Sequence, residues 1–415
     1  MDDRQIINIA HKYKTPLYLF DGDRLEETYF NMKKVLPDAF EFFYSVKANP
    51  SYGICRILQK CSSGIEVASA GELHLALEAG FDNKKILFTG PGKTYSELEF
   101  AVDSKILAIN AESYKEIMLI DDIAKAKNKI VDVGLRIHPN FKIESKNPAI
   151  SMMGTGTQFG VDIDEIPEIL KYIKSSKNLN LVCFHVYAGS QIFQPDTTLA
   201  YFEQTINIFK ELIEKNDLHI KVLDFGGGFG VSYDGKNKPY DFEYFGAEIN
   251  KLYHKYEDFF QGKKLVFESG RLLLAESGVF LTEVQYRKVL HDKVFLITDG
   301  GMNHNSLSTF REKKIRGNFL MKILDNRNEE ETVTVAGPLC TPEDILGRNV
   351  TLNKADRGDI LCIKNTGAYG SSFSPLGFLG HPAPCEVLIY KNNEYYLKKH
   401  GVFKNILNGQ EIIEL

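Results

Sequence analysis

Eight short apolar segments, each followed by a stretch with helical spacing, occupy the first two thirds of the chain. In helical stretches such as 70–80 and 112–127, apolar residues recur every three to four positions. The apolar segments end bluntly, as strands do when other layers cover both faces of a parallel sheet. They are EFFYSV (41–46), GIEVA (64–68), ILFT (86–89), ILAI (106–109), VDVGLRI (131–137), LNLVCFHV (179–186), IKVLDF (220–225) and KLVFES (264–269). Eight such units over roughly 250 residues predict an α/β fold, a closed (β/α)8 TIM barrel. An open, doubly wound sheet is the alternative.

The pattern of alternating apolar and helical segments ends after Gly278. Strand-like segments then follow one another with turn residues and little helical pattern, which indicates an antiparallel β domain. The early segment TPLYLF (15–20) is a candidate to join it. We therefore expect a barrel over residues 24–278 and a β domain built from residues 1–23 and 279–415.

Composition excludes several classes of protein. With 50 Lys and Arg against 55 Asp and Glu, the net charge is -5, and no basic block suggests a nucleic-acid surface. No run approaches the roughly 18 apolar residues of a membrane span, and the polar start does not resemble a signal peptide, so a cytoplasmic protein is predicted. Six cysteines without a CxxC pair predict neither a disulfide framework nor a zinc site.

Polar residues stand at the ends of several predicted strands. Lys47, Arg136 and His185 end or follow the first, fifth and sixth strands, and Glu268 with Arg271 follows the eighth. Barrel enzymes work at this edge, so these side chains are expected to converge. Each also has a structural explanation: a lysine that extends to solvent, a core histidine with satisfied partners, or a Glu268–Arg271 ion pair.

Three consecutive glycines follow the seventh strand in DFGGGFGVSY (224–233). Residues without a Cβ let backbone N–H groups approach an anion, although a tight turn without a ligand has the same composition. The segment matches neither the dinucleotide nor the nucleotide-hydrolysis fingerprint. An amine, an anion cradle, a carboxylate and an imidazole on one edge fit pyridoxal phosphate, which needs a lysine, phosphate ligands and a partner for its ring nitrogen.

An ordered set of motifs then resembles the alanine-racemase-fold decarboxylases that use pyridoxal phosphate, the group of the diaminopimelate, ornithine and arginine decarboxylases. The motifs are YSVKANP (44–50), EVASAGEL (66–73), FTGPGK (88–93), DFGGGFG (224–230), ESGR (268–271), GPLCTPEDIL (337–346) and NTGAYG (365–370). The resemblance covers nearly the whole chain and implies a barrel with a β domain. It also implies a homodimer whose active site is completed across the interface.

By position, the resemblance implies a role for each matching residue. Lys47 would form the Schiff base, His185 would stack on the ring, and Glu268 would pair with the ring nitrogen. The phosphate and its surroundings would be held by Ser190, Gly227, Gly228, Gly270, Arg271 and Tyr369. The substrate would meet Arg271 and Thr341, and Arg136, identified by its place at a strand end, is a third candidate for contact with the substrate. Cys340 would reach in from the partner subunit, where it or Lys47 could return a proton. Racemases of this fold place an arginine at the ring nitrogen, so Glu268 favours decarboxylation.

The substrate region departs from the diaminopimelate and ornithine enzymes. Those enzymes carry an acidic residue after the GPLC cysteine to pair with a distal ammonium, whereas here Thr341 follows Cys340. Segment 299–319 lacks their arginine-proline element, and HVYAGSQ (185–191) is two residues longer than the usual HIGSQ. Leaving a buried ammonium without a counter-ion costs several kcal/mol, so a diamine precursor is disfavoured.

A further set of motifs resembles the decarboxylases that act on a glutamyl group thioesterified to an acyl-carrier protein. It comprises HVYAGSQ, FESGRLLLAESG (267–278), LTEVQYRK (281–288), DGGMNHN (299–305) and SFSPLGFLGHPAPCEVL (372–388). Basic residues in 310–319 could meet an acidic carrier protein, or could form an ordinary solvated face. The alternatives are a diaminopimelate or other free amino-acid decarboxylase, and a non-catalytic pyridoxal-phosphate-binding protein, which the presence of Lys47, Glu268 and Cys340 disfavours.

Overall fold

The computed structural model describes residues 1–139, 157–187, 189–309, 317–324, 329–411 and 413, and divides into two compact units. The barrel unit comprises Glu26–Val231 and Pro239–Leu272, and the β unit comprises Met1–Leu25, Ser232–Lys238 and Leu273–Leu415. Most of the basic segment considered for a carrier protein, residues 310–316, lies outside the described residues.

The barrel unit holds a closed parallel barrel, which confirms the predicted fold and excludes the open sheet. The eight strands pair in the order β5-β4-β3-β2-β10-β9-β8-β6, and β5 also pairs with β6, which closes the ring. Their bounds are β2 Phe40–Ser45, β3 Gly64–Val67, β4 Ile86–Thr89, β5 Ala108–Ala111, β6 Val131–His138, β8 Leu179–His185, β9 Val222–Asp224 and β10 Lys264–Ser269. A short strand, β7 (Val161–Asp162), pairs with the end of β6.

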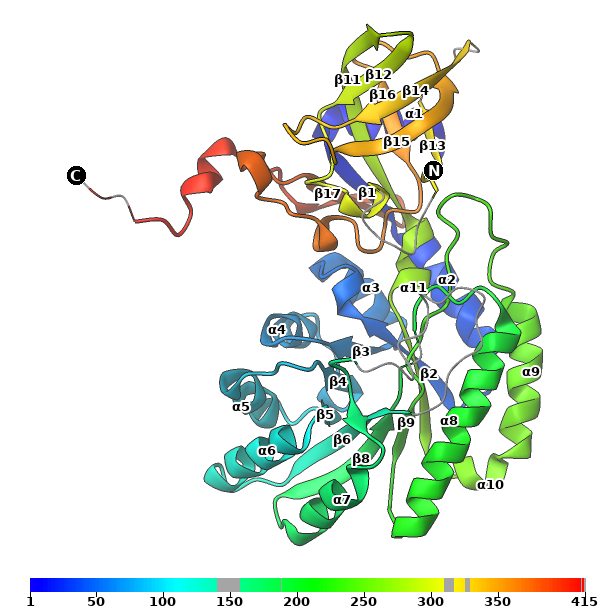
Figure 1. Ribbon diagram of the computed structural model, residues 1–415, viewed down its shortest axis with the longest axis vertical. Helices are drawn as coiled ribbons and strands as arrows, with labels where there is room; N and C mark the ends of the chain where they lie inside the picture. Colours follow the sequence, from blue (N-terminus) through cyan, green and yellow to red (C-terminus); the bar gives the residue numbers. More distant parts are fainter. Residues whose placement is uncertain (140–156, 188, 310–316, 325–328, 412, 414–415) are drawn as a thin grey trace. The chain divides into compact units, whose positions relative to one another are not determined.

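Helices surround the barrel strands (Figure 1). They are α2 Gly22–Lys34, α3 Tyr52–Lys60, α4 Ala70–Glu78, α5 Tyr95–Ser104, α6 Tyr114–Ala126, α7 Ile166–Ser175, α8 Pro195–Asn216, α9 Phe242–Lys255, α10 Glu257–Phe260 and α11 Arg271–Leu274. Several begin at a side-chain cap: Ser69, Thr94 and Ser113 each accept a hydrogen bond from the backbone N–H three residues on. Such caps satisfy N–H groups of the first helical turn that have no partner within the helix.

Aromatic side chains form the core on one side of the barrel wall. The rings of Phe40 and Phe267 stack with centroids 5.1 Å apart, and Phe202 of α8 lies 4.3 Å from Phe225. Successive residues of a strand point to opposite faces, so a strand that directs Phe267 towards this layer directs Glu268 to the other side. The aromatic core thereby fixes the strand that carries Glu268.

The β unit is built on a largely antiparallel sheet, as predicted. Its strands are β1 Leu17–Asp21, β11 Gly278–Leu290, β12 Lys293–Thr298, β13 Met321–Ile323, β14 Glu330–Ala336, β15 Ile345–Asn353, β16 Ile360–Ile363, β17 Cys385–Tyr390 and β18 Asn393–Lys398. The early segment joins this sheet as β1, between β11 and β17, as expected. Two pairings, β1 with β17 and β12 with β14, are parallel. Helix α1 (Asp3–Tyr13) packs its buried face on the same core.

None of the helices in the described ranges has both the length and the apolar character needed to cross a membrane.

Candidate active site at the ends of the barrel strands

Lys47 follows strand β2 in a single 3-10 turn, Val46–Ala48. Its ammonium nitrogen lies 3.1 Å from Oε2 of Glu66, and Glu66 is 1% exposed while the lysine side chain remains 45% exposed. Glu66 stands on β3 opposite Ser45 of β2, so the pairing of the two strands brings the carboxylate to the lysine. The lysine therefore has a buried acidic partner rather than only solvent.

Three polar side chains come together at the ends of β8, β9 and β10. They belong to His185, Asp224 and Glu268, all almost fully buried, and their nearest ligating atoms lie within 4.8 Å of one another. His185 Nε2 is 3.7 Å from Glu268 Oε1. Both ring nitrogens of His185, Asp224 Oδ2 and Glu268 Oε1 lack a hydrogen-bond partner among the residues that the structure describes. Buried polar atoms are nearly always paired, so this cluster is a site that a polar ligand would complete.

The surroundings shift the pKa values of these groups in different directions. Burial, reinforced by the positive charges of Arg136 and Lys47, lowers the pKa of His185 well below its ordinary value. Burial and the neighbouring charges of Asp224 and Glu66 raise the pKa of Glu268 well above that of an exposed glutamate. Burial also raises the pKa of Asp224 to about 7. A cation placed beside Glu268 would favour its carboxylate form.

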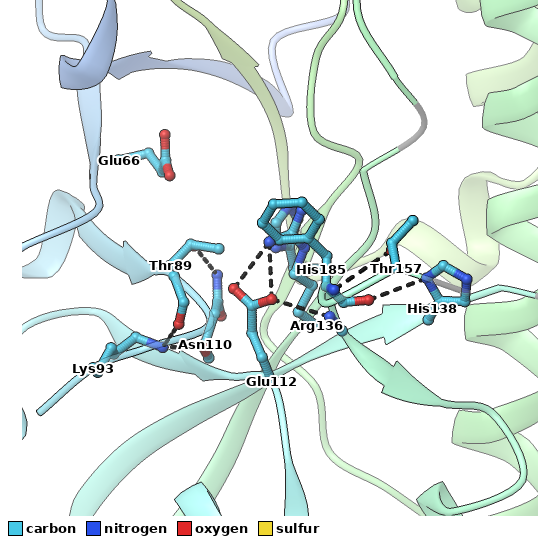
Figure 2. A network of polar contacts seen from close by, with 12 residues as sticks. Glu66, Thr89, Lys93, Asn110, Glu112, Arg136, His138, Thr157 and His185 are labelled. Atoms are coloured by element: carbon cyan, nitrogen blue, oxygen red, sulfur yellow. Dashed lines mark hydrogen bonds and ion pairs between the residues drawn. The ribbon is translucent and has the colours of Figure 1, made fainter. Parts of the chain in front are cut away.

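Arg136, near the end of β6, is held by a buried acidic partner (Figure 2). Its Nη1 donates to Glu112 Oε1 at 2.9 Å and to Oε2 at 3.0 Å, and its guanidinium lies 4.7 Å from the centre of the Phe159 ring. Glu112 also accepts from the backbone N–H of Gly160 at 3.0 Å. Part of the guanidinium is thus committed to a structural ion pair, and its role towards substrate stays a prediction.

A lysine with a buried side chain supports this network. Lys93 of the FTGPGK motif is 1% exposed, bonds to Glu116 at 2.6 Å, and donates to the carbonyl oxygens of Gly90 and Asn110. Glu116 in turn accepts from the backbone N–H of Glu112 at 2.9 Å. Figure 2 shows Lys93 beside Thr89 and Asn110, which hydrogen-bond to each other. These contacts give Lys93 a structural role.

The glycines after β9 and β10 are required by close packing. A Cβ on Gly227 would lie 2.0 Å from the carbonyl oxygen of Glu268, and one on Gly228, where φ is +106°, would lie 2.2 Å from that of Gly189. A Cβ on Gly270 would lie 2.8 Å from Ala48, beside Lys47. The loop after β9 therefore approaches both the Glu268 backbone and the segment after β8, where Ser190 accepts from Tyr187 Oη at 3.4 Å. Ala188 of HVYAGSQ lies outside the described residues.

Three predicted site residues belong to the β unit. Cys340 is exposed, and Tyr369 adopts a positive φ of 57°. The hydroxyl of Thr341 donates to the carboxylate of the exposed Glu343. An acidic group thus accompanies Thr341, two residues beyond the position where the diaminopimelate enzymes are expected to carry theirs. The region around Thr341 therefore contains a carboxylate, although the position directly after Cys340 is neutral.

The turn that carries Cys340 is anchored by a buried aspartate. Asp344 accepts from the backbone N–H of Leu339 at 2.7 Å and of Met302 at 2.6 Å. It is 2% exposed, and a Cβ at either Gly301 or Gly337 would collide with its carboxylate. Asp344 thereby fixes the residue directly before Cys340.

The residues present in the barrel unit fit pyridoxal phosphate. The structure gathers Lys47, Arg136, His185, Gly227 and Glu268 at the carboxyl ends of the strands, as expected. A flat, charged cofactor with a phosphate needs polar partners for its ring and a loop of small residues for its phosphate. The site offers both: the nitrogens of His185 and Oε1 of Glu268 have no hydrogen-bond partner in the described residues, and the glycine positions cannot hold a larger residue. Arg271 begins α11, three residues beyond Glu268.

Several functional candidates were not assigned a role from the sequence. Glu66 and Asp224 are charged residues within apolar strands, the signal that identified Lys47 and Glu268, and could have been found in the same way. Glu343 lies two residues after Thr341 in GPLCTPEDIL and could also have been found from the sequence. Glu112 could not, because its partner Arg136 lies 24 positions away.

Comparison with known proteins shows the family to which the chain belongs. Residues 23–275 match the family model described as the pyridoxal-binding domain of pyridoxal-dependent decarboxylases. The L-glutamyl-[BtrI acyl-carrier protein] decarboxylase of Niallia circulans is 38% identical over 99% of this chain and 97% of its own length. The diaminopimelate decarboxylase of Aquifex aeolicus is 29% identical over 96% of this chain and 92% of its own.

A solved structure shares the fold over nearly the full length. The diaminopimelate decarboxylase of M. jannaschii in complex with L-lysine superposes with a TM-score of 0.90 at 27% identity, covering 98% of this chain and 94% of that one. The chain belongs to the pyridoxal-dependent decarboxylases. It is an amino-acid decarboxylase, a carboxy-lyase whose cofactor is pyridoxal phosphate.

Proposed function

We propose that this enzyme removes the α-carboxylate of a glutamyl group tethered through a thioester to an acyl-carrier protein. The observation that carries the proposal is the similarity, along almost the whole chain, to a decarboxylase named for that substrate. Thr341 at the position after Cys340 supports it, because a thioester-linked distal end is neutral and needs no acidic partner there.

Pyridoxal phosphate, when bound, supplies an aldehyde for a lysine amine and a protonated ring that accepts the electron pair left by loss of CO2. Lys47 is the residue that would hold it covalently. The ion pair with Glu66, 3.1 Å from the lysine nitrogen, positions the amine and favours its charged form, so Lys47 would have to lose a proton before it reacts with the aldehyde.

Glu268 would hold the ring nitrogen protonated, and the uncharged imidazole of His185 would lie against the ring face. The backbone N–H groups of Gly227 and Gly228 would bind phosphate, helped by four further residues, Ser190, Gly270, Arg271 and Tyr369. Arg271 and Arg136 are the cations available for a substrate carboxylate. The high pKa of buried Glu268 in the cofactor-free protein would fall once the cationic ring is opposite it.

The β domain, taken as residues 1–23 and 279–415, would complete the site in a homodimer. Cys340 of the partner subunit would then approach the substrate, and its exposure within its own chain supports this arrangement. It or Lys47 would return a proton to the carbon from which CO2 has left.

One observation favours a second candidate, a diaminopimelate decarboxylase. Glu343 provides a carboxylate beside Thr341, and such a group could act as counter-ion to the distal ammonium of a diamino acid. The two candidates differ in what the distal end of the substrate must carry.

Release of CO2 from three substrates tests the proposal: glutamyl-loaded carrier protein, free L-glutamate and free meso-diaminopimelate. We expect turnover of the loaded carrier, detected as a mass loss of one CO2 on the intact carrier, and little turnover of the free acids. Lys47→Ala should abolish it, and borohydride reduction should attach the cofactor to Lys47 in the parent enzyme. Turnover of meso-diaminopimelate alone, lost in Glu343→Gln, would select the second candidate.

A further inference from the structure

The side chain of Gln191 joins the two loops that follow strands β8 and β9. It is 5% exposed, and its carboxamide makes two hydrogen bonds to the backbone of Val231. Nε2 donates to the carbonyl oxygen of Val231 at 3.1 Å, and Oε1 accepts from the N–H of the same residue at 2.9 Å. A carboxamide offers a donor and an acceptor as a peptide group does, so Gln191 pairs with Val231 much as a neighbouring strand would.

Backbone contacts continue this pairing along both loops. The N–H of Ile192 donates to the carbonyl oxygen of Gly228 at 2.9 Å, and the N–H of Gly230 donates to the carbonyl oxygen of Ile192 at 2.8 Å. Val231 is 3% exposed, and among the described residues Gln191 is the partner of both its backbone groups. Buried backbone groups are nearly always paired, so the end of the loop after β9 depends on this side chain.

The backbone conformation at Gln191 shows that a side chain is needed there. Its φ is +61°, in the left-handed region that residues other than glycine seldom adopt. Glycine would adopt this conformation at less cost but would leave Val231 unpaired. A glutamate would have the same length, but its carboxylate has no hydrogen to donate to the carbonyl oxygen of Val231. A neutral carboxamide is therefore suited to this position.

The two loops carry residues proposed above to bind the cofactor phosphate. Ser190 directly precedes Gln191, and Gly227 and Gly228 lie shortly before Val231. The N–H groups of the two glycines donate to no atom of the described residues. An anion bound by both loops has to meet the serine hydroxyl and these N–H groups at hydrogen-bonding distances at the same time, so the spacing of the loops decides how well it is held.

We infer that Gln191 is a positioning residue for the cofactor phosphate. Its carboxamide fixes the loop after β9 against the loop after β8, so that Ser190 and the two glycine N–H groups meet one anion. Gln191 acts through these groups rather than by touching the phosphate. The inference rests on the phosphate role proposed for Ser190, Gly227 and Gly228.

Absorbance titrations of the cofactor-free protein with pyridoxal phosphate, and with pyridoxal, which lacks the phosphate, test the inference. Gln191→Met keeps the length of the side chain and removes both hydrogen bonds. It should bind pyridoxal phosphate at least about tenfold more weakly, because binding must then order a loop that is no longer held in place. Its affinity for pyridoxal should stay within about threefold of the parent. Gln204→Met changes an exposed glutamine of α8 and is the matched control, which should bind both compounds as the parent does.

The selectivity of the loss distinguishes positioning of the phosphate from general support of the barrel. Equal losses of affinity for the two compounds would show that Gln191 only stabilises the fold and would overturn the inference. An unchanged affinity for pyridoxal phosphate in Gln191→Met would overturn it as well. If Gln191→Met does not fold, Gln191→Asn takes its place, because its carboxamide is one carbon shorter and does not reach Val231 in the same way. The same selective loss is expected.

Ser190→Ala separates a failure of this inference from a failure of the proposed function. It should reduce the preference for pyridoxal phosphate over pyridoxal in the parent, and by a smaller factor when combined with Gln191→Met, because the serine and the glycine loop are then no longer held together. Equal factors in the two backgrounds would overturn the positioning role of Gln191 alone. A parent protein that binds both compounds equally would overturn the phosphate role of the two loops, and the inference with it.

Discussion

Replacing Glu112 by alanine should lower the free energy of unfolding by about 3 to 5 kcal/mol, the usual cost of leaving one member of a buried ion pair without its partner. Arg136 and Glu112 have side chains only 10% and 2% exposed, so water cannot replace the lost carboxylate easily. The same change removes the acceptor for the Gly160 N–H. The loss should therefore reach the upper part of that range.

Urea-induced unfolding followed by circular dichroism measures this effect. Glu112→Gln, which keeps an acceptor oxygen, should lose less. Replacing both partners, Glu112→Leu with Arg136→Met, should recover much of the stability, because no buried charge is then left alone. As a control, Asp103→Ala removes an exposed partner of Lys127 and Lys129 and should cost less than about 1 kcal/mol. If Glu112→Ala lowers the free energy of unfolding by no more than Asp103→Ala does, the claim that Arg136 depends on this partner is refuted.

Three further outcomes follow from the same contacts. Burial lowers the pKa of His185, so below a pH of about 6.5 the unfolded chain takes up a proton that the folded chain does not. The free energy of unfolding therefore falls as the pH drops through that value. In cofactor-free His185→Asn, unfolding measured against pH should show a shallower fall. Gly227→Ala should destabilise the barrel and weaken cofactor binding, since its Cβ would lie 2.0 Å from a carbonyl oxygen, whereas Gly92→Ala, with no atom within 4 Å, should be tolerated in the same titration. Asp344→Ala leaves two buried N–H groups unpaired at about 1 to 3 kcal/mol each, and Asp344→Asn, with one acceptor left, should lose about half as much in urea unfolding; equal losses would contradict this account.

The barrel could be predicted because its strands are covered on both faces and appear in the sequence as continuous apolar runs. Strand β5, which corresponds to the fourth predicted segment (106–109), covers Ala108–Ala111. It extends two residues beyond the predicted end because it includes the polar but buried Asn110, which hydrogen-bonds to Thr89 of β4. In the β unit, no strand was predicted at β13, β15 or β18, and β13 has only three residues. Strands β15 and β18 lie at the two ends of the sheet order and expose many polar residues, so they lack the apolar signal.

Part of the candidate site could likewise be predicted from the sequence, and part could not. A charged residue at the end of an apolar strand is unusual enough to identify Lys47 and Glu268 from the sequence alone. The ion pair of Arg136 with Glu112 joins residues 24 positions apart. Which of the many acidic residues reaches that arginine depends on the closure of β5 against β6, and this follows from the assembled barrel rather than from any local pattern.

The division of the chain into units has a consequence for engineering. The chain passes between the two units at four junctions, Leu25/Glu26, Val231/Ser232, Lys238/Pro239 and Leu272/Leu273. The barrel is therefore not one continuous stretch of the gene: a shuffling experiment that transplants it from a homologue must also redesign the seven-residue excursion 232–238 or bring in the matching β segments. Recombination between relatives should succeed when the barrel, residues 232–238 and the matching β segments are exchanged together.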